Sequence, residues 1–247
     1  MVYTGLSYEG ELKAKEQQLR EFFDRARLKV ETFHSTTTTS NYNFLNYRNK
    51  VVYHFAKQKG KWAIGYRTEP SHEIVDVEND PLARPEINAK LPEIRRSVLA
   101  LLTNGPQAVR RDIEQKGNVT VRWTQKTGVK WWVGDAPKDL VLKETTCGRD
   151  FEVPADGFYQ VNPEVGEELV KAVVAEYEKS AKDYLKRTGE SIRYWCSVLN
   201  LIRIYHDAGK EAQAAEQRAK LANPKYKALA GWMPGSLMDD LKKRKLL

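Results

Sequence analysis

The run KVVYHFAKQKGKWAIGYR, from Lys50 to Arg67, decides the fold of the first part of this chain. Two segments rich in β-branched and aromatic residues flank the short polar sequence QKGK, and this pattern is typical of a β-hairpin. The segment HEIVDV, which ends at Val77, has the same character and extends the hairpin by a third strand. The run therefore predicts an antiparallel sheet.

Strand signals return farther along the chain. They fall on NVTVRWT, VKWWVG and LVLKE between Asn118 and Glu144, with a last short strand at Phe151 to Val153. Two helices are expected beside them, one over Tyr8 to Leu28 and one over Glu86 to Leu102, because apolar side chains recur there at helical spacing. Residues 1–162 are therefore predicted to be an α+β domain, an antiparallel sheet with flanking helices.

From Pro163 the pattern changes to helices without a convincing strand. We predict helices over Pro163 to Arg187, Ile192 to Asp207 and Lys210 to Leu221, the last two joined as a helical hairpin through Asp207-Ala208-Gly209. Residues 163–247 are thus expected to form an all-helical C-terminal extension. Its last turn carries the basic cluster KKRK at 242–245, which we interpret as a solvated helix end rather than a phosphate contact.

Charge is the bulk property that bears on function. The 247 residues include 41 Lys and Arg against 33 Asp and Glu, which gives a net charge of +8 and favours a polyanionic partner. No stretch is apolar for the roughly 18 residues that a membrane span needs, so no membrane partner is expected. Cys147 and Cys196 stand apart from one another and from the four histidines, so neither a metal site nor a metal cofactor is expected.

Three segments carry a resemblance to a known family. Leu6 to Lys15 is the first; the second combines NYRNKV at 46–51, IGYR at 64–67 and SHEIVDV at 71–77; the third is GFYQVN at 157–162. In this order they resemble the RNA 5-methyluridine (uracil-C5) methyltransferases that modify ribosomal and transfer RNA, and they cover the central RNA-facing domain of that family. The resemblance implies an RNA partner, with ribosomal RNA favoured.

Departures from the family pattern predict that the chain is not catalytic. A cysteine-proline pair of the family reads Asp80-Pro81 here, and after Gln160 no G-x-G turn follows that could curl against S-adenosylmethionine. Gln160 matches a cofactor-contacting glutamine, but we interpret it as a vestige that holds local backbone. The sequence therefore predicts no cofactor, no catalytic residue and a pseudoenzyme derived from a methyltransferase.

RNA contacts are expected from basic side chains that lie near aromatic residues in the predicted strands, because cations neutralise phosphates and aromatic rings stack on bases. The expected RNA-binding residues are Arg48, Lys50, Lys59, Lys61, Arg67, Arg122, Lys126 and Lys130.

Three functional hypotheses remain open at this point. The first is a non-catalytic RNA-binding component of a ribonucleoprotein, such as a ribosome or its assembly intermediate, that contacts other proteins through the helical tail; a mitochondrial location is then favoured over a cytoplasmic one. The second is the RNA-recognition subunit of a split methyltransferase. The third is a protein-binding adaptor that acts through residues 188–247.

Overall fold

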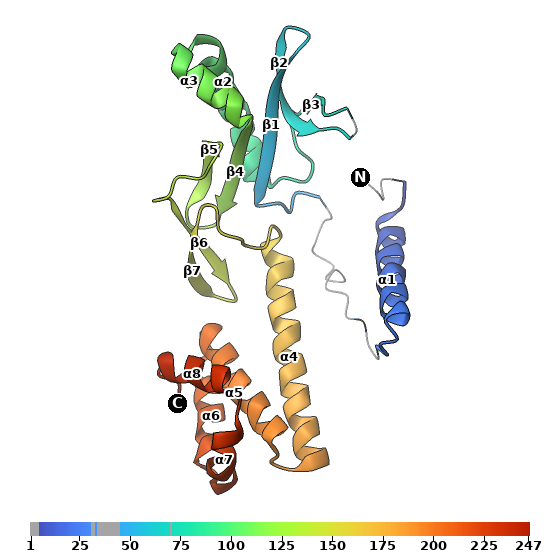
Figure 1. The fold of residues 1–247 in the computed structure, drawn as a ribbon, viewed down its shortest axis with the longest axis vertical. Coiled ribbons are helices and arrows are strands. Elements are labelled where there is room, and N and C mark those ends of the chain that lie inside the picture. The colour runs from blue at the N-terminus through green and yellow to red at the C-terminus, as the bar shows by residue number, and fades with distance from the viewer. Residues whose placement is uncertain (1–4, 31–32, 34–44, 70) are drawn as a thin grey trace.

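The computed structural model describes residues 5–30, 33, 45–69 and 71–247. Figure 1 shows an elongated molecule in which a long helix, α4 (Pro163–Thr188), runs from a sheet-containing part to a group of helices. We call residues 45–162 the sheet unit and residues 163–247 the helical unit. The α+β fold with an antiparallel sheet, flanking helices and C-terminal helices is confirmed.

The main sheet has five antiparallel strands in the order β3-β2-β1-β4-β5. Along the chain these are β1 (Lys50–Gln58), β2 (Lys61–Arg67), β3 (Ile74–Asp76), β4 (Asn118–Thr124) and β5 (Gly128–Val133). The predicted hairpin is β1–β2, and β1 becomes the central strand because β4 pairs with its other edge. Gly65 makes the approach of β3 possible, since a Cβ atom there would lie 1.9 Å from the carbonyl oxygen of Val75.

One face of this sheet is covered by α2 (Pro85–Asn104), and α3 (Gln107–Lys116) contributes Ile113 to the same core. The buried side chains of α2 follow the predicted stripe and meet alternate residues of β1 and β4, which are Val51, Tyr53, Phe55, Val119 and Val121. Each apolar side chain buried in this way stabilises the fold by about 1.5 to 3 kcal/mol relative to exposure. Helix α3 was missed from the sequence because it is short and places only one side chain in the core.

The remaining strands, β6 (Val141–Thr146) and β7 (Arg149–Pro154), form a separate two-stranded sheet. Its turn contacts the helical unit: the Cys147 backbone N–H donates to Oε1 of Glu167 at 2.8 Å, and Nη1 of Arg149 donates to the carbonyl oxygen of His206. The hairpin therefore links the sheet unit to the helical unit at a point distant in sequence from their covalent junction.

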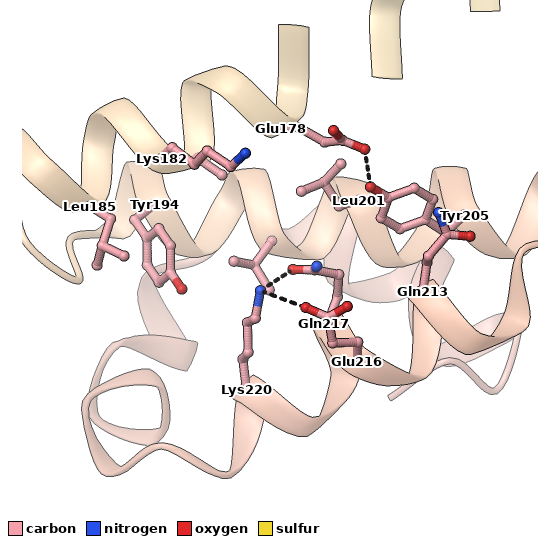
Figure 2. Close-up of a pocket in the computed structure, with 12 residues that line it drawn as sticks. Glu178, Lys182, Leu185, Tyr194, Leu201, Tyr205, Gln213, Glu216, Gln217 and Lys220 are labelled. Carbon is pink, nitrogen blue, oxygen red and sulfur yellow. Dashed lines mark hydrogen bonds and ion pairs between the residues drawn. The ribbon is translucent and has the colours of Figure 1, made fainter. Parts of the chain in front are cut away.

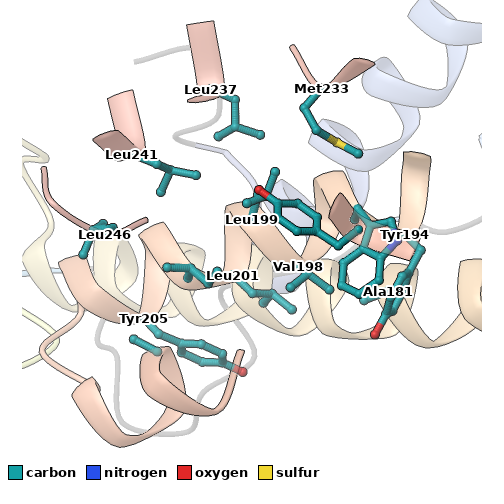
Figure 3. Packing of buried hydrophobic residues seen from close by; sticks show 14 of the residues in the cluster. Ala181, Tyr194, Val198, Leu199, Leu201, Tyr205, Met233, Leu237, Leu241 and Leu246 are labelled. Carbon is teal, nitrogen blue, oxygen red and sulfur yellow. The ribbon is translucent and has the colours of Figure 1, made fainter. Parts of the chain in front are cut away.

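The helical unit continues after α4 with α5 (Ile192–Asp207), α6 (Glu211–Ala219), α7 (Pro224–Leu229) and α8 (Gly235–Lys243). Seven buried residues of α5, among them Trp195 and Leu199, lie at the centre of its hydrophobic core. Figure 3 shows α5 side chains beneath Leu237 and Leu241 of α8. The sequence predicts three helices here and does not predict α7 or α8; the six residues of α7 are too few to show a clear period.

Helix α1 (Tyr8–Arg25) begins after Ser7, an N-cap whose Oγ accepts the N–H of Gly10. None of its residues is buried, and it lies to the side of α4 in Figure 1. The run from Ser35 to Ser40 is polar and has no helical or strand period, so a loop is expected there; it lies outside the described residues.

Two negative findings apply to the described residues only. Among them, no helix combines the length and apolar character needed to cross a bilayer. Within the same ranges, His, Cys, Asp and Glu side chains do not gather into a group that could hold a metal ion.

Candidate nucleic-acid interface

The face of the main sheet opposite α2 is the part of the molecule best placed to meet RNA. We call it the open face and define it by Lys50, Val52 and His54 of β1 with Lys61 and Arg67 of β2. Successive side chains of a strand point to opposite faces, and Val51, Tyr53, Phe55 and Ile64 already point toward α2. The side chains of Lys50, Val52 and His54 therefore point away from the core, and so do those of Lys61 and Arg67.

The cations of the open face remain available to a ligand. Lys61 and Arg67 are exposed, and no carboxylate of the described residues lies within ion-pair distance of either. Burial and the charge of Arg122 lower the pKa of Lys50, while Asp156 acts in the opposite direction. Two of the predicted residues, Lys61 and Arg67, thus lie on one strand with Lys50 on its neighbour.

His54 lies between these cations, and its pKa is lowered in this environment. Burial lowers its pKa, and the positive charge of Arg67 lowers it further, against a hydrogen bond to the Gly117 backbone. The imidazole is therefore held neutral near pH 7. A neutral His54 beside Arg67 adds a hydrogen-bonding group to the open face without adding charge.

Lys59 is also exposed, in the tight turn of the β1–β2 hairpin, where its φ of 47° and the φ of 82° at Gly60 place both residues in the left-handed region. Lys126 lies in the β4–β5 turn and Lys130 in β5, where the register through Arg122 turns Lys130 to the same face as Lys50. Both are exposed, but Lys126 forms an ion pair with Asp150. The predicted basic residues therefore do not form one cluster: the hairpin tip and the β4–β5 turn are at opposite ends of the sheet.

Arg122 is a correction to the predicted RNA-binding set. Its side chain is only 1% exposed and makes an ion pair with Glu144 at 2.9 Å. Nη1 also donates to the backbone oxygens of Ala155 and Gly157, at 3.3 and 3.2 Å. Arg122 thus fastens the β6–β7 hairpin and the segment after it to the sheet, and no phosphate could reach it. Alternation could not reveal this, because the hairpin that covers this part of the face is a separate element.

Arg48 is half-buried, and its side chain contacts a neighbouring tyrosine. It stacks against the ring of Tyr47, and a hydrogen bond to the Tyr47 hydroxyl raises the pKa of the guanidinium. Its Nε is buried without a hydrogen-bond partner. The prediction that Arg48 binds RNA therefore stays a prediction, and substitution of Arg48 would test packing together with binding.

A buried carboxylate beside Arg48 explains one departure from the family pattern. Asp80 is almost fully buried and accepts hydrogen bonds from the hydroxyls of Tyr53, at 3.0 Å, and Tyr66, at 2.6 Å. Burial and Asp80 together raise the pKa of both tyrosines. The aspartate of the Asp80-Pro81 pair is therefore a structural anchor for β1 and β2, a role that the sequence did not reveal.

The GFYQVN segment connects the hairpin to α4 and carries an aromatic ring that the sequence analysis did not single out. Phe158 is 83% exposed. Gln160 is exposed too, and its side chain packs against Gly166 in the first turn of α4. The adjacent rings of Trp131 and Trp132 are less accessible, since the first is partly buried and the second is buried.

The described residues do not fit S-adenosylmethionine in the way that the resemblance implies. Cofactor pockets of that kind need a strand that ends in a Gly-rich turn. Residues 163–247 are all described, and they contain helices and connecting turns without a strand.

A cavity of about 300 Å³ lies between α4, α5 and α6 in the helical unit (Figure 2). At one end the Tyr205 hydroxyl donates to Glu178 of α4, and at the other Nζ of Lys220 binds Gln217 at 2.9 Å. Its lining mixes acidic, basic and aromatic side chains, so it has no charge preference for a polyanion. The open face remains the better candidate for RNA.

Comparison with known proteins relates the chain to RNA methyltransferases. It is 22% identical over 275 residues to a Thermosynechococcus vestitus protein described as an uncharacterised RNA methyltransferase; the match covers 91% of this chain and 59% of the relative. The chain thus spans about three fifths of the relative's length. Among solved structures, that of a Pyrococcus abyssi tRNA (uracil-54, C5)-methyltransferase in complex with S-adenosyl-L-homocysteine matches with a TM-score of 0.46 and 14% identity, over 69% of this chain and 49% of the other. No protein-family model matches.

The sequence match confirms the resemblance to RNA methyltransferases that the motifs indicated. It also shows that the prediction of a pseudoenzyme was wrong. A match over 91% of the chain must extend well beyond Asn162, so the helical part belongs to the methyltransferase-like region instead of replacing it. The absence of a Gly-rich turn after Gln160 concerns only the place where a cofactor would bind. It does not show that the chain takes no part in catalysis.

Proposed function

We propose that this chain binds RNA through the open face and serves RNA methylation by recognising the substrate. The observation that carries the proposal is the position of Lys61 and Arg67, two exposed cations on one strand of a sheet face that α2 and α3 leave uncovered. The methyltransferase match supports RNA as the polyanion. Phosphates would meet these cations, and unpaired bases would meet the exposed ring of Phe158.

The test is a double substitution, Lys61→Glu with Arg67→Glu, in the full chain. Both side chains are exposed, so the fold should persist. Binding of single-stranded RNA is measured by fluorescence anisotropy at several salt concentrations. Loss of two phosphate contacts should weaken binding at low salt and reduce the slope of log K against log salt by about 1.4, since each contact contributes about 0.7.

The matched control is Lys242→Glu with Lys243→Glu, which makes the same charge change at the exposed end of α8. The control should keep the salt slope of the natural chain. Equal losses in the two variants would show that only total charge matters, and a loss in the control alone would move the RNA site to the basic tail.

A second proposal concerns the setting in which RNA is bound. The proposed ligand is ribosomal RNA within a ribonucleoprotein particle. The cavity of Figure 2 is the proposed contact surface for a neighbouring protein of that particle. Its support is the mixture of Lys182, Glu178 and tyrosine side chains along that cavity. Sedimentation of the tagged full chain with ribosomal particles tests it: a Lys182→Glu variant should leave the particles, whereas Lys227→Glu, exposed on α7, should remain with them.

A further inference from the structure

A second cavity lies where the sheet unit meets the helical unit. Its volume is about 500 Å³, and its walls come from the beginning of α2, the end of β4, β6 and the beginning of α4. The lining residues are Arg84, Glu86, Trp123, Gln125, Glu144, Thr145, Pro163, Glu164 and Glu167. A cavity of this size is within the range that binds small organic molecules.

One wall of the cavity is a flat, fixed surface. The guanidinium of Arg84 lies over the ring of Trp123, 4.3 Å from its centre. An ion pair with Glu164 fixes the guanidinium at its edge, because Nη1 of Arg84 lies 2.6 Å from Oε1 of Glu164. RNA-binding proteins stack unpaired bases on aromatic rings and on arginine planes, so this wall is suited to a planar base.

The charges of the cavity exclude a phosphate and favour a ligand rich in N–H groups. Four carboxylates line it against one guanidinium. Three of them already have partners, since Glu144 binds Arg122, Glu164 binds Arg84 and Glu167 accepts the Cys147 N–H. Glu86 is different: it is exposed, and its contact with Nε of Arg84 is 3.8 Å long, beyond hydrogen-bond range. Its oxygens can therefore accept from a ligand.

We propose that this cavity binds an unpaired guanine base of the RNA, stacked on Arg84 and read by the Glu86 carboxylate. A carboxylate offers two acceptors side by side, and guanine offers two adjacent donors, N1–H and the N2 amino group. Uracil has one N–H between two carbonyl oxygens, while adenine and cytosine place a ring acceptor beside their amino group. This inference rests on the proposed function, because it assumes that the chain binds RNA.

The experiment measures the affinity of the full chain for short single-stranded RNAs that differ only in one central base. The natural chain should bind the guanine-containing RNA about tenfold more tightly than the uracil-containing one, in the range for one well-recognised base. Glu86→Gln, a change at an exposed position, replaces one acceptor by a donor and should reduce this ratio to about twofold or less. Glu93→Gln, on the exposed face of the same helix, is the matched control and should retain it.

The outcomes separate this inference from the proposed function. If the RNAs bind with equal affinity, or if another base is preferred, the guanine site is overturned while RNA binding stands. If the preference for guanine survives in Glu86→Gln, a different group reads the base and the assignment fails. If no RNA binds, both proposals fail. Arg84→Lys adds a second check, because it keeps the charge but removes the stacking plane and should weaken binding of the guanine-containing RNA.

Discussion

The sheet unit and the helical unit differ in how they use their charges, although their net charges are the same. Residues 45–162 hold 19 basic and 15 acidic side chains, and residues 163–247 hold 16 and 12. In the helical unit some cations are paired with a neighbour, as Arg218 is with Glu211 and Arg244 with Asp207, while others such as Lys242 are exposed at a helix end. On the open face Lys61 and Arg67 have no such partner among the described residues. Placement and pairing, more than total charge, locate the RNA candidate.

The two units also differ in packing. In the helical unit α5 is surrounded by its neighbours, and its aromatic residues Tyr194 and Trp195 meet Tyr226 in the core. The sheet unit is covered on one face by α2, whereas among the described elements the β6–β7 hairpin is what reaches the other face. A face that is left partly bare can bind a ligand without disturbing the core.

The largest effect that would test this comparison is expected from Trp195→Ala. Trp195 is 1% exposed at the centre of the helical core, and its truncation should cost about 3 to 5 kcal/mol of unfolding free energy. Because the two cores are separate clusters, the helical unit should melt first and the sheet tryptophans should keep their near-UV signal. Thermal unfolding followed by circular dichroism at far- and near-UV wavelengths measures both.

The control for that experiment is Trp232→Ala, since Trp232 lies in the same unit but is 74% exposed. It should change stability by less than about 0.5 kcal/mol. A single transition that moves as a whole in Trp195→Ala would show that the two units unfold together, and the comparison between separate cores would be lost.

The next effect concerns the ion pair between Arg122 and Glu144 in the sheet unit. Arg122→Ala should cost about 3 kcal/mol, because it leaves the Glu144 carboxylate buried without its partner. The double variant Arg122→Met with Glu144→Leu removes both charges and should recover most of that loss. Urea unfolding measures the free energy, with Lys126→Ala, which breaks the exposed pair with Asp150, as the control.

A loss below about 1 kcal/mol in Arg122→Ala would contradict the structural role given to this residue. Arg122 would then return to the set of residues available to RNA, and the difference between buried and surface charges in the sheet unit would disappear.

The smallest effect is a shift in the titration of His54. Arg67 lowers the pKa of the imidazole, so Arg67→Gln should raise it, although burial will keep it below the value of a free histidine. With its folded pKa lowered, neutral His54 favours the fold above the unfolded pKa of about 6.5, and this contribution is lost as the pH falls through the folded pKa. NMR titration of the imidazole measures the shift; an unchanged pKa would mean that Arg67 points away from the open face.

Much of this architecture was readable from local patterns. Alternation gave β1, β2 and β4 within a residue or two. The apolar stripe of α2 was correct except at its end, where Leu102 is buried in place of Leu101, because a helix that packs on a sheet must repeat every three to four residues. Lys61 and Arg67 were also placed correctly at the surface, since charged residues at strand ends seldom enter a core. The interpretation of catalysis was wrong because it inferred a role from a missing motif.

What the sequence determined by itself was the class of fold, the division of strands and helices near Asn162, and the resemblance to RNA methyltransferases. The tertiary structure decided which cations are available: it buried Arg122 under a hairpin more than twenty residues away, gave Asp80 two tyrosine partners, and brought Arg84, Trp123 and Glu164 around one cavity. The physical reason is that periodicity reports which face of an element is apolar, whereas the burial and pairing of a charge depend on segments distant in sequence.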